Sequence, residues 1–197
     1  MTVDLALSIV IIAVSYFMGN ISPAILIGRM HGIDIKKEGS GNAGTTNVLR
    51  VLGKKAAAAT LVIDVLKGVA AVLLGKYVCG FDIALICGIA VFCGHIWPVI
   101  FKFKGGKGVA TALGVIITSV PLLGAGILVF AVALIALSRR VSVGAVFAAL
   151  VFPFAAFFYD RELIVWAVVL AVIILIKHRS NIKRLLKGDE PKLNFRK

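Results

Sequence analysis

The sequence contains few charged residues. Only 16% of its 197 residues are Asp, Glu, Lys or Arg, whereas 60% are hydrophobic, and the mean hydropathy is +1.05. A soluble domain needs more polar surface than these residues can supply, so the composition indicates an integral membrane protein. Because no polar stretch is long enough to fold by itself, we expect a single domain over residues 1–197.

Cysteine and histidine are scarce, and neither shows the spacing of metal ligands. The cysteines lie in apolar runs without a C-x-x-C pair, and the histidines are far apart; they are Cys79, Cys87, Cys93, His31, His95 and His178. Zinc sites need grouped ligands of these types. We therefore expect no metal and no cofactor, and we interpret the cysteines as packing residues.

Acidic residues are outnumbered by basic ones, 9 to 22, which gives a net charge of +13. All but three of the basic residues lie in or beside four segments, which are 29–55, 102–107, 139–140 and 177–197. This clustering follows the positive-inside rule and places the four segments on the cytoplasmic side. The expected partners are therefore the lipid bilayer and anionic substrates, and not nucleic acid.

The long apolar runs predict an all-α membrane bundle of about seven transmembrane helices, with the N-terminus outside and the C-terminus cytoplasmic. The N-terminus has no basic segment, so we expect the first run to remain as a membrane helix. The runs are 5–27, 56–74, 83–101, 109–137, 141–158 and 163–176.

The run 109–137 is too long for one span and short for two. A single span would place Arg139 and Arg140 outside, against the charge rule. We therefore prefer two short helices that are broken near Pro121.

Two charged residues, Asp64 and Lys67, lie inside an apolar run at positions i and i+3. Residues with this spacing share one face of a helix and can form an ion pair. Charges inside a membrane face the bundle interior or a cavity. We expect this pair to support the structure, and we regard a direct role in substrate binding as the weaker alternative.

The most polar stretch of the chain follows the first run and extends from residue 39 to residue 50. Its glycines allow backbone N–H groups to converge on an anion, and its side chains add further donors. A flexible, solvated loop is the alternative interpretation. The candidate ligands are Gly39, Ser40, Gly41, Asn42, Gly44, Thr46, Asn47 and Arg50.

A second glycine-rich stretch follows the third run. It resembles a nucleotide phosphate loop, but Phe101 and Gly108 occupy positions where that pattern requires Gly and Ser or Thr. The dinucleotide pattern formed by the first stretch fails too, because membrane helices flank it in place of strands. The lysines and a following helix N-terminus still predict phosphate binding, by Lys104, Gly105, Gly106, Lys107, Gly108 and Thr111.

A third polar stretch, residues 178–190, follows the last run and contains His178, Asn181 and Glu190. A histidine among basic residues tends to be neutral, so His178 is suited to accept a hydrogen bond or a proton. His95 lies near the inner end of an earlier helix, where a lone histidine is most often only structural. All three stretches fall on the predicted cytoplasmic side, which favours one composite site.

Together these motifs resemble the bacterial acyl-phosphate:glycerol-3-phosphate acyltransferase family. The match rests on GSGNxGxTNxxR at 39–50, GHxxPV at 94–99, FxGGKGVAT at 103–111, and HRxNIxRL at 178–185 with Gly188 and Glu190. The resemblance implies acyl transfer from acyl phosphate to the 1-hydroxyl of glycerol 3-phosphate, without coenzyme A or acyl carrier protein. It also implies a multi-pass protein of the bacterial inner membrane. Functional coupling to the enzymes that make acyl phosphate and add the second acyl chain is a further expectation.

Under this resemblance, the catalytic candidates are Ser40, Arg50, His95, His178 and Asn181. The first stretch would hold the acyl phosphate, and the second would hold glycerol 3-phosphate. The proton acceptor stays open between His95, His178 and a substrate phosphate. A covalent acyl-Ser40 intermediate is disfavoured, because no Ser–His–acid triad is readable. The alternative function is a membrane carrier of an anionic phosphate ester, and a lipid head-group binder ranks third.

Overall fold

The computed structural model describes residues 4–193, and this part of the chain is helical, without β-strands. The predicted all-α membrane class is confirmed. The helices form two compact units, one that ends at Ser119 and one that begins at Val120, and each is described by itself. The expectation of a single domain stays a prediction.

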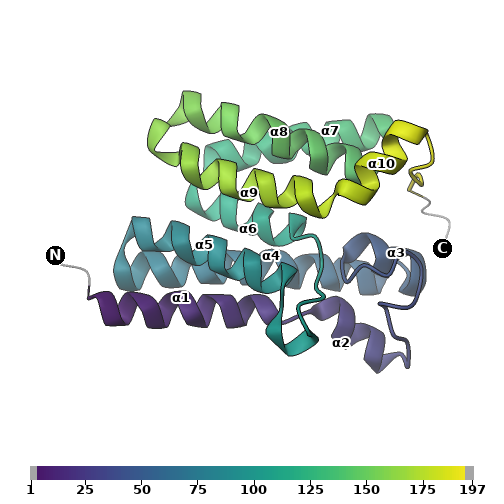
Figure 1. Cartoon of the computed structure of the whole chain (residues 1–197), viewed down its shortest axis with the longest axis horizontal. Coiled ribbons are helices and arrows are strands. Elements are labelled where there is room, and N and C mark those ends of the chain that lie inside the picture. Colours follow the sequence, from purple (N-terminus) through teal and green to yellow (C-terminus); the bar gives the residue numbers. More distant parts are fainter. Residues whose placement is uncertain (1–3, 194–197) are drawn as a thin grey trace. The chain divides into compact units, whose positions relative to one another are not determined.

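The first unit contains three long helices and several short ones. Helix α5 packs against α1, α4 and α6, and α4 also packs along α6 (Figure 1). The elements are α1 (Leu5–Asn20), α2 (Pro23–Met30), α3 (Thr45–Leu52), α4 (Lys54–Cys79), α5 (Phe81–Ile96), the 3₁₀ turn Val99–Phe101, and α6 (Val109–Ser119).

Glycines bring these helices into close contact. A Cβ added to Gly94 of α5 would meet the carbonyl oxygen of Tyr16 in α1, and one added to Gly68 of α4 would meet that of Thr111 in α6. Small residues allow membrane helices to approach with their backbones in contact. This packing fixes the end of α5 from which the second glycine-rich stretch emerges.

The break between α1 and α2 has a local cause. Ser22 is extended, at φ −110° and ψ 94°, and Pro23 is the first residue of α2. Proline disfavours the helical conformation of the residue before it, but its own geometry suits a helix start. The break leaves carbonyl groups at the end of α1 without hydrogen-bond partners in their own helix. Lys67 of α4 donates to two of them, those of Gly19 and Ile21.

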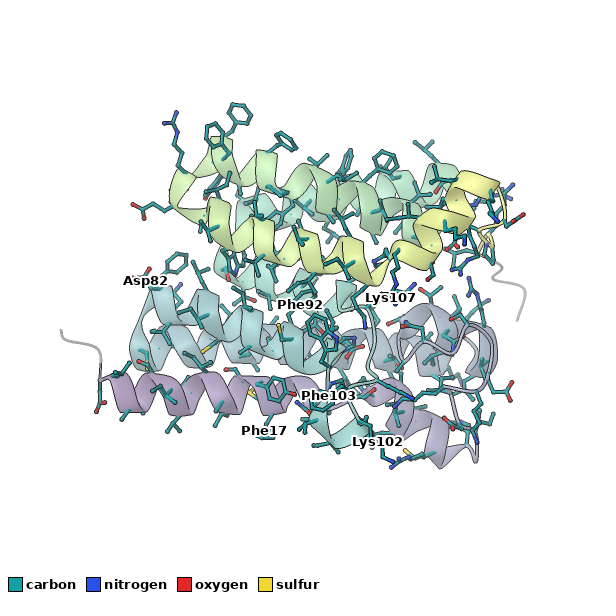
Figure 2. All side chains as sticks on the ribbon, in the orientation of Figure 1. Phe17, Asp82, Phe92, Lys102, Phe103 and Lys107 are labelled. Carbon is teal, nitrogen blue, oxygen red and sulfur yellow. The ribbon has the colours of Figure 1, made fainter. Side chains whose placement is uncertain are left out.

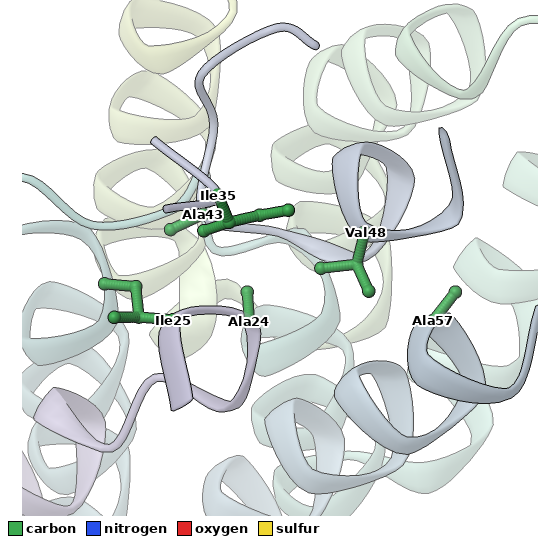
Figure 3. Close-up of a cluster of buried hydrophobic side chains, with 6 residues drawn as sticks. All are labelled: Ala24, Ile25, Ile35, Ala43, Val48 and Ala57. Atoms are coloured by element: carbon green, nitrogen blue, oxygen red, sulfur yellow. The ribbon is translucent and has the colours of Figure 1, made fainter. Parts of the chain in front are cut away.

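A small hydrophobic cluster supports the polar stretch that follows α2. Figure 3 shows its side chains converging from α2, the connecting loop, α3 and α4. Its buried members are Ala24, Ile25, Ile35, Ala43, Val48 and Ala57. Two of them belong to the 39–50 stretch itself, so this stretch is anchored to the helices and is not a freely solvated loop.

The second unit is a helical hairpin extended by a third helix and a bent tail. Helix α8 packs against α7 and α9. Phe152 of α8 and Trp166 of α9 form an edge-to-face pair with ring centroids 5.6 Å apart. The elements are α7 (Pro121–Ser138), α8 (Val141–Tyr159), the 3₁₀ turn Arg161–Leu163, α9 (Ile164–Lys177) and α10 (Arg179–Lys187).

The run 109–137 forms two helices, as preferred from the sequence. Helix α6 ends at Ser119, and Pro121 begins α7. Proline has no N–H to donate to a preceding turn but is well suited to a first helical position. The break therefore lies at the predicted place, for the predicted reason.

Five helical segments of the described residues are long and apolar enough to cross a membrane, and a sixth is added if the pair bent by 60° at His178 counts as one span. All the predicted runs are largely helical, but the run 5–27 is interrupted between Asn20 and Pro23, and the run 83–101 between Ile96 and Val99. However, the 11 residues of α6 extend only about 16 Å, half of a bilayer core. The count of seven spans and the orientation of the termini stay predictions. Figure 2 places Asp82 toward one end of the first unit, away from Lys102 and Lys107. The sidedness predicted from the charges stays a prediction too.

Candidate functional site

The 39–50 stretch is folded around the side chain of Asn47, which is 1% exposed. Its Nδ2 donates to the carbonyl oxygens of Ile35 and Glu38, both at 3.0 Å. Its Oδ1 accepts the N–H of Ser40 at 2.8 Å. Asn47, expected to bind substrate, therefore shapes the loop that presents Ser40.

The glycine N–H groups of this stretch are also bonded internally. Gly41 donates to the carbonyl of Glu38 and Gly44 to that of Asn42, both at 3.0 Å. The positive φ of Gly39 (60°) and Gly41 (68°) explains why glycine is needed here. Because these two amides are occupied, an anion here would be bound by side chains and by the other N–H groups of the stretch. Of the predicted ligands, Ser40 and Arg50 are exposed, and Asn42 and Thr46 are partly buried.

The second glycine stretch is fastened to the end of α5. The N–H of Gly105 donates to the carbonyl of Ile96, and that of Gly106 to the carbonyl of His95, both at 3.2 Å. A Cβ at Gly105 would meet the His95 carbonyl oxygen, and one at Gly106 would meet the His95 ring. These glycines are thus required for close approach to α5.

Donors for an anion lie just beyond these glycines. The first bond of α6 joins the Ala112 N–H to the Gly108 carbonyl at 2.7 Å, so the N–H groups of residues 109–111 precede the helical ladder. Gly108 has φ 82°, and a Cβ there would meet Phe92, which lies in the interior of this unit (Figure 2). Lys104 is exposed and Lys107 is half-buried. In the described chain, the buried Oγ1 of Thr111 has no hydrogen-bond partner.

His95 belongs to a buried charged cluster that joins three helices. Lys67 Nζ lies 2.8 Å from Asp64 Oδ1 and 2.8 Å from His95 Nδ1. Asp64 Oδ1 is 3.2 Å from His95 Nδ1. Lys67 also donates to the carbonyls of Gly19 at 3.2 Å and Ile21 at 2.7 Å, at the end of α1. The predicted intrahelical pair is confirmed, but its contact with His95 was missed, because no local pattern links α4 to α5.

In the second unit, His178 lies at the bend between α9 and α10 and is buried. Its Nδ1 is 2.8 Å from the carbonyl oxygen of Ile174. A carbonyl only accepts, so Nδ1 carries the hydrogen, and Nε2 of the neutral ring has the lone pair. That this ring accepts a hydrogen bond or a proton from substrate stays a prediction.

Glu190 fastens the tail of the second unit. Its Oε1 accepts from Ser142 Oγ at 2.7 Å and Asn181 Nδ2 at 2.6 Å, and its Oε2 accepts from Arg184 Nε at 2.7 Å. Arg140 Nε donates to its backbone carbonyl at 2.8 Å. Burial raises the pKa of Glu190, but these three side-chain bonds and the Arg184 charge outweigh burial and lower it below its ordinary value. The Glu190 carboxylate thus fixes the position of the Asn181 side chain.

A hollow of about 420 Å3 in the first unit was not anticipated from the sequence. Two cations on its wall lie over the Phe101 ring, Arg29 at 5.6 Å and Lys36 at 5.2 Å. Burial lowers the pKa of Lys36; Asp34 opposes this, and Lys104 and Arg29 add to it. The lining residues are Ile25, Arg29, Gly32, Ile33, Asp34, Ile35 and Lys36.

The predicted site residues fall into two groups. Ser40, Arg50, His95 and both glycine stretches belong to the first unit, and His178 and Asn181 to the second. That all of them share one composite site stays a prediction. Within residues 4–193, no three His, Cys, Asp or Glu side chains are grouped as metal ligands.

Comparison with known proteins gives one consistent result. A family model described as glycerol-3-phosphate acyltransferase matches residues 9–188. A protein of that name from Thermoanaerobacter sp. (strain X514) is 49% identical over 183 residues, which cover 91% of this chain and 92% of the relative. Another, from Clostridioides difficile (strain 630), is 41% identical and covers 96% and 97% of the two chains.

Two solved structures are similar over nearly the whole chain. Both are crystal structures of PlsY, an integral membrane glycerol 3-phosphate acyltransferase. The glycerol 3-phosphate form has a TM-score of 0.90 at 34% identity and covers 95% of this chain and 96% of that chain. The lysophosphatidic acid form has a TM-score of 0.87 at 33% identity, with the same coverage.

Proposed function

Because the chain belongs to the glycerol-3-phosphate acyltransferase family, we propose that it transfers a fatty acyl group from acyl phosphate to the 1-hydroxyl of sn-glycerol 3-phosphate. The products are lysophosphatidic acid and inorganic phosphate. Structures of a related acyltransferase in its glycerol 3-phosphate and lysophosphatidic acid forms support the acceptor and the product. The reaction is the first acylation of phospholipid synthesis, on the cytoplasmic side of a bacterial inner membrane.

The observation that carries the proposal is the pair of anchored glycine stretches in the first unit. One presents Ser40 and Arg50, and the other presents Lys104, Lys107 and the start of α6. Both proposed substrates carry a phosphate, so two sets of anion-directed groups are needed. The apolar exterior of the helices suits a donor with a long acyl chain.

The donor is an activated mixed anhydride with a good leaving group. Catalysis therefore depends chiefly on positioning and on stabilising charge as the carbonyl is attacked. We assign the head group of acyl phosphate to the side chains of Ser40, Asn42, Thr46 and Arg50. Asn47 and the glycines at 39, 41 and 44 give this loop its shape.

The acceptor is assigned to the second stretch. Lys104, Lys107 and the N–H groups of residues 109–111 would bind the phosphate of glycerol 3-phosphate, with Thr111 Oγ1 as a further donor. The amides of Gly105 and Gly106 are bonded to α5, so these glycines act by allowing the close approach. His178 and Asn181 would orient the attacking hydroxyl, and transfer proceeds without an acyl-enzyme.

The test is phosphate release by purified protein in detergent, with acyl phosphate and glycerol phosphate as the only substrates. Ser40→Ala and Arg50→Ala should each lower kcat/KM by about 10²–10³, the usual effect of removing one charge-stabilising donor. Lys76→Ala is the matched control, because Lys76 is exposed near the far end of α4. Unchanged turnover in both site variants would refute the assignment.

Two further arms separate the alternatives. Replacing acyl phosphate by an acyl thioester should abolish product formation, and equal rates with both donors would refute the proposed donor. A carrier of phosphate esters would need a sealed compartment and would release no phosphate in detergent, whereas the proposed enzyme turns over without one.

A further inference from the structure

The Lys67 ammonium has three hydrogens and three lone-pair acceptors placed around it. These are the carbonyl oxygens of Gly19 at 3.2 Å and Ile21 at 2.7 Å, and His95 Nδ1 at 2.8 Å. Asp64 Oδ1 lies 2.8 Å from Lys67 Nζ and 3.2 Å from His95 Nδ1 and balances the charge. Within the described chain this oxygen has no hydrogen-bond partner, so it does not accept a hydrogen from Nδ1. Because Lys67 has only N–H donors, His95 Nδ1 is the acceptor in this contact.

This arrangement decides which nitrogen of His95 carries the hydrogen. A neutral imidazole has one N–H and one lone pair, and a partner at one nitrogen fixes the other. With Nδ1 accepting from Lys67, the hydrogen lies on Nε2. The two carbonyls are backbone atoms at the end of α1, and the three side chains are buried, so Lys67 is held in place beside Nδ1 of the ring.

The Nε2 edge of the ring faces the junction of the two glycine stretches. A Cβ added to Gly106 would meet both His95 Nε2 and the carbonyl oxygen of Ala43. Gly106 also donates its N–H to the His95 carbonyl at 3.2 Å. One residue of α5 therefore contacts the second stretch through its backbone and its ring, at the place where the first stretch approaches.

We propose that Asp64 and Lys67 lock His95 as an Nε2–H hydrogen-bond donor at this junction, where it positions both glycine stretches and does not accept the substrate proton. This inference rests on the proposed function. It makes Asp64 and Lys67 positioning residues that act through His95. Of the two buried histidines, His178 alone has Nε2 as its lone-pair nitrogen, so the proton acceptor is His178 or a substrate phosphate oxygen.

The direct test is the tautomer of His95, read by 15N NMR of the ¹⁵N-histidine-labelled full chain in detergent. The chain has three histidines, and His31→Gln and His178→Gln variants assign the signals. We expect a protonated Nε2 and an unprotonated Nδ1 at His95 and the reverse at His178. A protonated Nδ1 with a free Nε2 at His95 would overturn the proposal whatever the activity of the protein.

The kinetic test compares two substitutions of the ring. Glutamine can place an N–H near the position of Nε2 but cannot accept a proton, whereas leucine can do neither. We expect His95→Gln to keep kcat/KM within about tenfold of wild type and His95→Leu to lose about a hundredfold or more, mainly through a higher KM for glycerol phosphate. If His95 were the base, both variants would lose kcat equally, and the acidic limb of the pH–rate profile would disappear.

The role of Lys67 is tested by Lys67→Met with Asp64→Asn, which together remove the pair without leaving an unpaired charge. The double variant should lose the single-tautomer signal of His95 and raise the KM for glycerol phosphate about tenfold, with little further loss when His95→Gln is added. Lys76→Met, on the same helix, should change neither readout. Independent, additive effects would contradict action through His95. If the wild type releases no phosphate, the proposed function fails, while the tautomer test still stands.

Discussion

Replacing Glu190 by Gln should loosen the tail of the second unit. The carboxylate is 5% exposed and accepts three side-chain hydrogen bonds, from Ser142, Asn181 and Arg184, at 2.6–2.7 Å. Glutamine keeps one acceptor oxygen. Its NH2 group, however, takes the place of the other oxygen and faces a donor, so one of these hydrogen bonds is lost. The substitution also removes the negative charge beside Arg184. A neutral amide therefore cannot accept all three hydrogen bonds that the carboxylate accepts.

The magnitude follows from these contacts. A hydrogen bond to a charged group contributes about 1.5–3 kcal/mol. The Arg184 side chain is 39% exposed, so its ion pair adds only about 1 kcal/mol or less. We expect a loss of about 2–4 kcal/mol in unfolding free energy. At about 2–4 °C per kcal/mol for a chain of this size, the melting temperature should fall by about 5–15 °C.

Thermal unfolding of the detergent-solubilised protein, followed by intrinsic fluorescence, measures this change. Glu162→Gln is the matched control, because Glu162 is an exposed carboxylate in a turn of the same unit. Activity should fall with the Glu190 substitution too, because a neutral amide holds the Asn181 side chain less firmly than the carboxylate does. A melting temperature within 1–2 °C of wild type (about 0.5 kcal/mol) would show that the cluster does not stabilise the fold.

The remaining predictions concern acid and the two glycine stretches. Because the pKa of Glu190 is lowered in the fold, its contribution is full above the unfolded value of about 4.3 and is lost as pH falls through the folded value. The melting temperature should therefore drop steeply below about pH 4 in wild type and less in Glu190→Gln; parallel curves would contradict this. Gly106→Ala should raise the KM for glycerol phosphate about tenfold or more, since the new methyl group meets the His95 ring. Gly126→Ala is the control and should leave the KM unchanged, because a methyl group there has open space. A normal KM in Gly106→Ala would show that the position of the His95 ring does not affect substrate binding. Asn47→Ala removes three hydrogen bonds of about 1 kcal/mol each. Limited proteolysis should therefore cleave the 39–50 stretch faster than in wild type. Equal cleavage rates would show that Asn47 does not stabilise this stretch.

Local patterns in the sequence predicted the class of the fold well. Hydropathy located every apolar helix, because about 20 residues of one character are needed to cross a bilayer. Pro121 located the break between α6 and α7, since its ring fixes a helix start. The Asp64–Lys67 pair followed from i, i+3 spacing, which is a property of a single helix. These features depend on neighbours within one or two turns.

The sequence indicated which residue types make up the candidate site, but not which hydrogen bonds those residues form. Glycine and cationic residues marked both stretches, yet the predicted amide cradle does not form at Gly41 or Gly44, whose N–H groups bond within the loop. Likewise, the amide of Gly106 is bonded to α5. The residues suggested anion binding, but side chains and a helix start are left to provide it.

Only the tertiary structure revealed the partners that hold the functional side chains. His95 meets Lys67 across two helices, 28 residues apart in sequence, and Ser142 reaches Glu190 over 48 residues. Hydrogen bonds are short and directional, so they form wherever packing brings a donor to an acceptor, at any separation along the chain. Periodicity records which face of a helix is buried, whereas the partner of a buried polar group depends on how the helices are packed.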